Sequence, residues 1–209
     1  LTDLSDRLVM KGTPTRNQEQ LSIELDGLTL DVDVDTKRDF SIISATLMEE
    51  DLDQSFEIIS DLFYNAHFNE FDREKAKLLG ELQMELDSPK ARASDQFFST
   101  IFKGTAYGTT SSVLLNNADA LGTQADALSH YHRLFQPERM VVSVCGDTEP
   151  NTIKSALERH FPKQPGVDAY PMLSERSAEL QAHRITEEQY VTFARDDSSQ
   201  AHIYKGWIA

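Results

Sequence analysis

The fold class is set by residues 28–63, which read LTLDVDVDTKRDFSIISATLMEEDLDQSFEIISDLF. Apolar side chains alternate with polar ones over residues 28–34, which is the period of a half-buried strand. A polar turn at residues 35–39 leads to a more apolar strand at residues 40–48, so the pair predicts a β-hairpin. From Leu52 onward the apolar spacing becomes helical, and this change of period indicates an α+β fold.

Helices are predicted on both sides of the hairpin. Their approximate ranges are residues 4–10, 17–25, 52–63, 72–86, 94–102, 117–121, 124–135 and 150–161. Residues 140–145 form a continuous apolar run, which predicts a buried strand with Cys145 as a core thiol. We therefore expect a mostly antiparallel sheet packed with helices.

The chain is predicted to hold one nearly whole lobe and the start of another. Residues 1–163 would form the first lobe, and residues 164–182 a linker, because the segment that joins them contains Pro, Gly and Lys. Residues 183–209 contain two strand patterns, at 184–193 and 202–208. A helical pattern begins at once and a strand pattern is still running at the end, so we expect a piece of a longer protein.

Composition excludes several functional classes. The 209 residues carry 35 acidic and 20 basic side chains, for a net charge of −15, with an apolar fraction of 39%. Such acidity disfavours nucleic-acid binding, which needs a basic face. No apolar run is long enough to predict a membrane span. A single cysteine excludes an internal disulfide framework and a cysteine-based zinc site.

Several short sequence motifs occur in an order that is typical of one protein family. In chain order they are Lys11-Gly12-Thr13 after a short helix, Asp51-Leu52-Asp53-Gln54-Ser55 at a helix start, the long helix from Phe71 with Asp87-Ser88-Pro89 after it, Pro137-Glu138-Arg139-Met140-Val141-Val142-Ser143-Val144-Cys145-Gly146-Asp147, and Gln200-Ala201-His202-Ile203 to Gly206. This order resembles the insulinase, pitrilysin and mitochondrial processing peptidase family. The resemblance implies the first lobe of a two-lobe metallopeptidase-like fold, truncated at both ends.

Active members of that family are inverzincins with an H-x-x-E-H motif on a helix and a distal glutamate. Two His ligands and the distal Glu hold Zn²⁺, and the Glu inside the motif is the general base. The resemblance places the motif at residues 3–7 of this chain. Asp3 and Arg7 then stand at the two His positions, and Asp6 stands at the general-base position.

The distal carboxylates are retained. Glu81 matches the zinc-ligand position, and Glu74 matches a supporting carboxylate. Arg7, however, keeps its proton and offers no lone pair to a metal. Asp6 is one methylene shorter than the general base and would be misplaced. We therefore expect that zinc is lost, that no residue is catalytic, and that Arg7 pairs with Glu81 or Glu74 instead of a metal.

Two other sets of carboxylates in the sequence contain oxygen ligands of the kind that bind metal ions. Asp3, Asp6, Glu74 and Glu81 could form an oxygen-only site for Mg²⁺, Mn²⁺ or Ca²⁺, but Arg7 would share that cavity. Asp31, Asp33 and Asp35 lack the spacing of a calcium loop and a following bidentate Glu. A remnant salt-bridged pocket and a solvated strand face are the preferred interpretations.

The resemblance also implies a substrate-binding strand. In active relatives the corresponding segment is an edge strand that adds the peptide as a further strand. Here Leu28, Leu30, Asp31 and Asp33 are weak candidates for that role. The row of aspartates discourages association with other strands and attracts basic peptides.

The resemblance implies the role of the family's inactive subunits. Such a subunit pairs with a homologous catalytic zinc peptidase, or forms a homo-oligomer, and helps to enclose or bind peptide substrate. Two alternatives stay open. One is a structural core subunit of a larger complex with no proteolytic role, and the other is a metallopeptidase active with a non-standard metal site.

Overall fold

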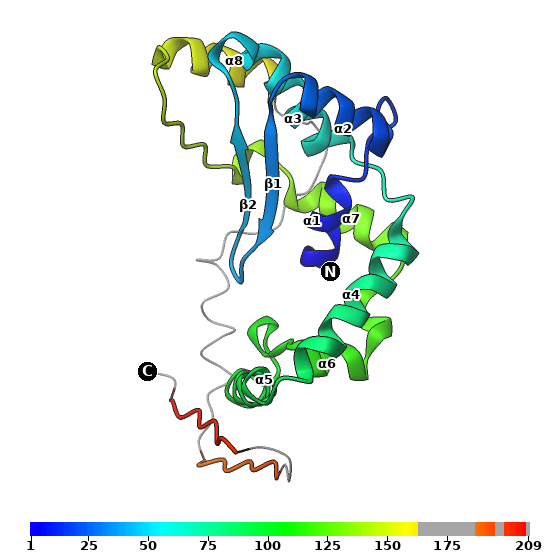
Figure 1. The fold of residues 1–209 in the computed structure, drawn as a ribbon, viewed down its shortest axis with the longest axis vertical. Coiled ribbons are helices and arrows are strands. Elements are labelled where there is room, and N and C mark those ends of the chain that lie inside the picture. Colours follow the sequence, from blue (N-terminus) through cyan, green and yellow to red (C-terminus); the bar gives the residue numbers. More distant parts are fainter. Residues whose placement is uncertain (163–186, 195–198, 208–209) are drawn as a thin grey trace. The chain divides into compact units, whose positions relative to one another are not determined.

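The computed structural model describes residues 1–162, 187–194 and 199–207 (Figure 1). The chain divides into two compact units. The first unit comprises Leu1–Glu74 with Gly122–Tyr170, and the second comprises Lys75–Leu121 with Pro171–Ala209. Helix α4 (Phe71–Leu86) begins in the first unit and ends in the second.

The first unit contains the predicted β-hairpin, which is confirmed. Strand β1 (Asp31–Thr36) pairs antiparallel with β2 (Ser41–Thr46), and Asp31 lies opposite Thr46. The first strand begins later than expected because the residues before it close a turn after a helix. There Thr29 has a φ of 48°, and Leu30 N–H donates to Leu25 O at 2.9 Å.

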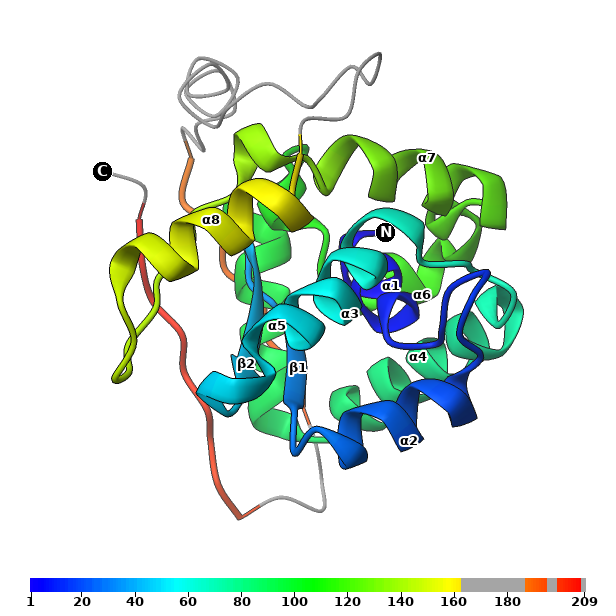
Figure 2. The ribbon, with the colours of Figure 1, turned by 90° about the horizontal axis from the view of Figure 1, so that it is seen from above.

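The first unit also contains helices that pack beside this hairpin and against one another. They are α1 (Thr2–Val9), α2 (Gln18–Gly27), α3 (Leu52–Asn65), α7 (Gln124–Leu134) and α8 (Pro150–His160), with 3₁₀ turns at Glu49–Asp51 and Pro137–Arg139. Helix α1 packs against α7 and β1, and α8 lies along α3 in the view from above (Figure 2). Capping boxes at Asn17 and Thr123 define where α2 and α7 start.

A buried tyrosine connects α7 to the end of α3 at the centre of this unit. Tyr131 on α7 is fully buried, and its hydroxyl donates to Leu62 O at 2.9 Å and accepts from Ala66 N–H at 3.1 Å. Both partners lie at the end of α3, where backbone groups lack partners within the helix. The tyrosine therefore satisfies these groups and fixes α3 against α7.

The second unit is built around an aromatic helix. It contains α5 (Pro89–Ile101), α6 (Ser111–Asn116) and 3₁₀ turns at Ala106–Gly108 and Ala118–Leu121. Ser88 caps α5, and Asp95 accepts hydrogen bonds from the backbone N–H and hydroxyl of Ser112. The Phe97 ring lies 6.0 Å from that of Tyr204, and Arg92 lies over the Phe193 ring. These contacts place the described C-terminal segments on α5.

The predicted strand at residues 140–145 is wrong for the described part of the chain. The backbone is extended at Met140, but no described strand pairs with this run, and Val141 is 95% exposed. Cys145 is also exposed, contrary to the expected core thiol. An apolar run indicates a preference for burial, whereas a β-strand also needs a neighbouring strand that supplies its hydrogen bonds.

The C-terminal expectations are tested only in part. Residues 187–194 and 199–207 contain no assigned strand, so the two predicted strands are not formed there. The linker at 164–182 lies outside the described residues, and the lobe boundaries stay a prediction. No helix within the described ranges is long and apolar enough to cross a membrane. The α+β class itself is confirmed.

Candidate functional site

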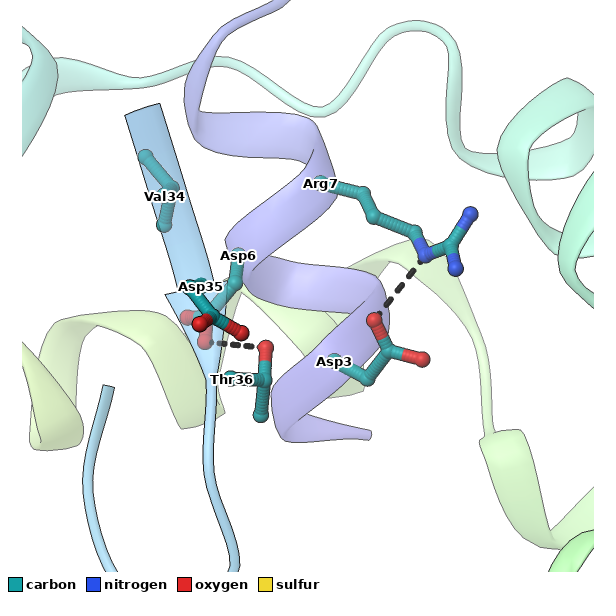
Figure 3. Close-up of a pocket in the computed structure, with 6 residues that line it drawn as sticks. All are labelled: Asp3, Asp6, Arg7, Val34, Asp35 and Thr36. Atoms are coloured by element: carbon teal, nitrogen blue, oxygen red, sulfur yellow. Dashed lines mark hydrogen bonds and ion pairs between the residues drawn. The ribbon is translucent and has the colours of Figure 1, made fainter. Parts of the chain in front are cut away.

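Helix α1 and strand β1 line an open cavity of about 410 Å³ (Figure 3). Its walls are formed by Asp3, Asp6 and Arg7 from α1 and by Val34, Asp35 and Thr36 from β1. The three α1 residues share one helix face, because positions three and four apart are neighbours on a helix surface. The fold thus places Asp3, Asp6 and Arg7, the residues compared above with the H-x-x-E-H motif, next to the hairpin.

Asp6 is the most buried residue of the cavity wall, with 1% of its surface exposed. Its Oδ2 accepts hydrogen bonds from Thr36 Oγ1 at 2.7 Å and Ser41 Oγ at 2.5 Å. Asp6 therefore ties α1 to both strands of the hairpin. Burial raises the pKa of this carboxyl above its ordinary value, although the bonds from Ser41 and Thr36 act in the opposite direction.

The other oxygen of Asp6 is left without a partner. Oδ1 is inaccessible to solvent and accepts no hydrogen bond from any described residue. Buried carboxylate oxygens are normally satisfied, so each exception calls for a physical explanation.

Arg7 and Asp3 form an ion pair at the cavity mouth. Arg7 Nε lies 2.9 Å from Asp3 Oδ1, one helical turn away (Figure 3). Their side chains are 29% and 46% exposed. The guanidinium therefore neutralises the neighbouring acid, at the two positions that the resemblance assigns to histidine ligands.

Glu74, at the start of α4, has a different partner from the expected one. Lys11 Nζ lies 3.1 Å from Glu74 Oε1, and the glutamate side chain is only 6% exposed. Lys11 reaches this carboxylate from the turn that follows α1, a contact that the sequence did not predict, and the expected Arg7–Glu74 pair stays a prediction. A sequence signal was available, since Lys11 is a second cation four positions after Arg7.

The turn that carries Lys11 is held rigidly. Gly12 has a φ of +122°, and a Cβ there would lie 2.5 Å from Arg16 O, so only glycine fits. Thr13 Oγ1 and Arg16 Nη1 both donate to Asp61 Oδ2 on α3, at 2.7 and 2.8 Å. Burial would raise the pKa of Asp61, but these donors hold it below its usual range.

Glu81 belongs to the second unit. On its own helix it lies 3.9 Å from Lys77, one turn earlier. The expected Arg7–Glu81 pair would involve residues of both units, and it stays a prediction.

The candidate substrate-binding residues occupy three different environments. Leu28 and Leu30 lie before β1, and Leu30 is 4% exposed and part of the core. Asp31 and Asp33 are exposed on β1, as expected for a charged strand face. A role of these residues in substrate binding stays a prediction.

The described residues contain no cluster of metal-binding side chains, at this cavity or away from it. Within residues 1–162, 187–194 and 199–207, no group of three or more His, Cys, Asp and Glu side chains is placed to hold one metal ion. His130 Nε2 instead lies 2.9 Å from Thr2 Oγ1. Burial, aided by nearby positive charge, lowers the pKa of His130 to about 4, so its imidazole is neutral at physiological pH.

Comparison with known families gives two matches along the chain. The family model described as Insulinase (Peptidase family M16) matches residues 1–112. The model described as Peptidase M16 inactive domain matches residues 123–209.

Curated relatives match over most of this chain. An uncharacterized zinc protease of Mycobacterium tuberculosis is 22% identical over 205 residues, which cover 96% of this chain and 45% of that protein. The mitochondrial-processing peptidase subunit beta of Lentinula edodes is 27% identical over 204 residues, covering 95% of this chain and 42% of that protein. The chain therefore spans less than half the length of these relatives.

Solved structures share the fold. A protease from Helicobacter pylori matches with a TM-score of 0.68 and 20% identity, over 81% of this chain and 42% of that one. The peptidase M16 inactive domain from Pseudomonas fluorescens matches with a TM-score of 0.66 and 16% identity, over 79% of this chain and 42% of that one. These identities establish similarity of fold alone.

Proposed function

This chain belongs to the insulinase family of peptidases (family M16), and on that premise we propose that it is a non-catalytic member that works beside an active zinc peptidase. The observation that carries the proposal is the Arg7–Asp3 ion pair at the two positions of the histidine ligands. A guanidinium brings positive charge to the place where the family binds a cation, and it has no lone pair to donate.

The remaining residues do not fit zinc either. Asp6 stands at the general-base position, but its Oδ2 is bound by Thr36 and Ser41, which hold the carboxyl against the hairpin. Glu74 is occupied by the ammonium of Lys11. Two side-chain cations of this chain thus supply the positive charge that the acids of the site require, and no step of catalysis runs through a metal here.

The proposed partner is a homologous catalytic subunit or a second copy of the chain. Two findings support a paired role. One curated relative is named as the beta subunit of a processing peptidase, and residues 123–209 match an inactive-domain model. The acidic surface, with a net charge of −15, would help to hold basic peptides by electrostatic attraction. The partner would supply zinc and the general base.

Co-expression with a homologue from the same genome that carries an intact H-x-x-E-H motif tests the proposal. We expect peptide cleavage from the pair and none from this chain alone. Replacing the motif glutamate of the partner should abolish cleavage, whereas Arg7→Gln in this chain should leave it unchanged, because Arg7 takes no part in chemistry.

Two results would overturn the proposal. Chelator-sensitive cleavage by this chain alone would make it an unorthodox metallopeptidase. A homologue that cleaves equally well without this chain, together with isolation of the chain in a complex free of peptidase activity, would favour the structural-subunit alternative.

A further inference from the structure

A row of aromatic rings runs along α5 and into the 3₁₀ turn that follows it. The Phe97 ring meets the Phe98 ring edge-on at 5.4 Å, and Phe98 stacks on Phe102 at 6.1 Å, with 7° between the ring planes. Phe102 in turn lies 5.6 Å from Tyr107. All four side chains are only half-buried, so the row ends at Phe97 in a ring that a further aromatic group can meet.

Residues 199–207, from the other end of the second unit's sequence, add a fifth ring to this row. The Tyr204 ring lies 6.0 Å from the Phe97 ring, with the planes tilted by 34°. Gly206, two positions later, also lies against Phe97, so closely that a Cβ on it would be 2.7 Å from Phe97 Cζ. One aromatic ring of α5 thus holds a tyrosine and a glycine of the same short segment.

The docked segment has the alternation of an extended chain. Tyr204 and Gly206 face α5, whereas Ile203 is 88% and Trp207 is 79% exposed. Side chains that point alternately to opposite sides are typical of an extended backbone. The segment forms no strand with any described residue, so no ladder of backbone hydrogen bonds fixes it in place.

A second contact on α5 is of the same weak kind. The guanidinium of Arg92 lies 5.0 Å from the centre of the Phe193 ring, and both side chains are exposed. An exposed cation–π contact and a single pair of aromatic rings each stabilise a structure only slightly. Segments with few buried apolar contacts open locally at low cost. The C-terminal segments are therefore seated on α5 in a way that allows them to leave.

We propose that the Phe97 end of the aromatic row is a docking site for an extended peptide with an aromatic residue two positions before a glycine, and that residues 199–207 of the same chain occupy and regulate it. The aromatic side chain of the peptide continues the row, as Tyr204 does. The glycine is required because a Cβ at that position meets Phe97 Cζ. A peptide with this pattern binds when the chain's own segment leaves.

Charge restricts the peptide further. The chain has a net charge of −15, which repels acidic peptides. The segment that occupies the site has no acidic residue from 199 to 206, and its ionisable side chains are His202, Tyr204 and Lys205. The site thus fits a neutral or basic peptide. Occupation within one chain is favoured over exchange between copies, because a tethered segment acts at an effective concentration of about 1 mM.

This inference goes beyond the proposed function and does not depend on it. It concerns a surface of the second unit and requires no catalytic partner. Failure of the peptide to bind would leave the non-catalytic role untouched, and failure of co-expression would leave the docking site untouched.

The chain's single tryptophan, Trp207, reports on the docked segment. We expect its fluorescence anisotropy to fall by about a third or more in Gly206→Val, because the new side chain displaces the segment from Phe97 and frees it to move on the nanosecond timescale. Gly146→Val is the matched control, since a Cβ there meets nothing within 4 Å, and it should leave the anisotropy unchanged. Tyr204→Ala covers the case in which the Phe97 ring moves aside for valine. Unchanged anisotropy in both segment variants overturns the proposal.

A fluorescein-labelled peptide of residues 199–206, which contains no tryptophan, tests docking from outside the chain. We expect saturable binding to the Gly206→Val protein, and binding at least about fivefold weaker to the original protein, in which the tethered segment competes. The same peptide with alanine in place of Tyr204 keeps the charge and should bind neither protein. Equal affinity for the two proteins, no saturable binding, or equal binding of the alanine peptide overturns the proposal.

Two further measurements locate the site and its occupant. Adding Phe97→Leu to Gly206→Val should abolish peptide binding, because the ring that meets Tyr204 is removed while the apolar character of the position is kept. Unchanged binding in this double variant contradicts the assignment. Gly206→Val alone should leave the sedimentation coefficient unchanged. A dimer of the original protein that dissociates in this variant would assign the site to a segment of a second copy and overturn occupation within one chain.

Discussion

Lys11 Nζ lies 3.1 Å from Glu74 Oε1, so a lysine in the turn after α1 neutralises a carboxylate at the start of α4 that is only 6% exposed. Buried ion pairs contribute little net stability, but removing one partner leaves a charge that has lost its hydration. The pair joins two segments that are far apart in the sequence. It therefore fixes where α4 starts relative to α1.

Lys11→Met should destabilise the protein by about 2–4 kcal/mol, because the Glu74 carboxylate would be left buried and unpaired. Urea unfolding at neutral pH measures the change. Lys77→Met is the matched control, since Lys77 is 59% exposed and its partner Glu81 lies 3.9 Å away, and it should cost less than about 0.5 kcal/mol. Adding Glu74→Gln to Lys11→Met should recover part of the loss. A loss in the Lys11 variant no larger than that of the control would contradict the role of the pair.

Tyr131→Phe should cost about 1–3 kcal/mol in unfolding free energy, because Leu62 O and Ala66 N–H would lose a buried partner while the ring is kept. The control is Tyr64→Phe, whose hydroxyl donates to Pro162 O at an exposed position and should matter less. Equal losses of unfolding free energy in the two variants would show that burial of the Tyr131 hydroxyl adds no stability.

Acidification should destabilise the fold through His130. Its pKa is about 4 in the folded chain and about 6.5 when unfolded, so between these values the unfolded chain binds more protons. The stability contributed by the neutral imidazole is thus present above pH 6.5 and is lost as pH falls toward 4. Because the ring is only partly buried, we expect a loss of about 1–2 kcal/mol.

The measurement for His130 is urea unfolding at pH 7 and pH 4.5. His130→Asn should flatten the slope with pH, whereas His202→Asn, at an exposed position of the second unit, should keep it. An unchanged slope in His130→Asn would assign the pH dependence to other groups.

Cys145 should react with a thiol reagent in the native protein at a rate close to that in urea, because its side chain is exposed. The expected ratio of the two rates is within about tenfold, far from the protection given by a core position. Val141→Ser, four positions earlier and 95% exposed, should change stability by less than about 0.5 kcal/mol. If Cys145 is labelled only when the protein unfolds, residues 140–145 are buried in the native protein and the exposed position is wrong.

Local patterns predicted the elements well where the signal lies within a few residues. The period-two pattern and the polar turn predicted the hairpin. The start of α5 was predicted five residues too late, because Ser88 caps the helix and Pro89 is its first residue. The strand predicted at residues 140–145 was wrong, since pairing depends on a neighbour that the run itself does not specify.

The site was predicted as a set of residues but not as a set of contacts. The family resemblance singled out Asp3, Asp6 and Arg7, and the structure places them on one face of α1. Lys11 as the partner of Glu74, and Thr36 and Ser41 as donors to Asp6, were missed. Each of these partners lies at least thirty residues from the acid it binds, so no short sequence window contains both.

The sequence by itself determined the α+β class, the hairpin and the helices that flank it, whereas the replacement of a zinc-binding motif by Asp3-Leu4-Ser5-Asp6-Arg7 stays a prediction from the family resemblance. Those features depend on backbone periodicity, capping and residue chemistry, which are local. Only the tertiary structure decided which cation meets which acid, and that one oxygen of Asp6 is buried with no hydrogen-bond donor among the described residues. Packing of α1 against the hairpin sets these contacts, because burial and hydrogen bonding between distant segments exist only once the chain has folded.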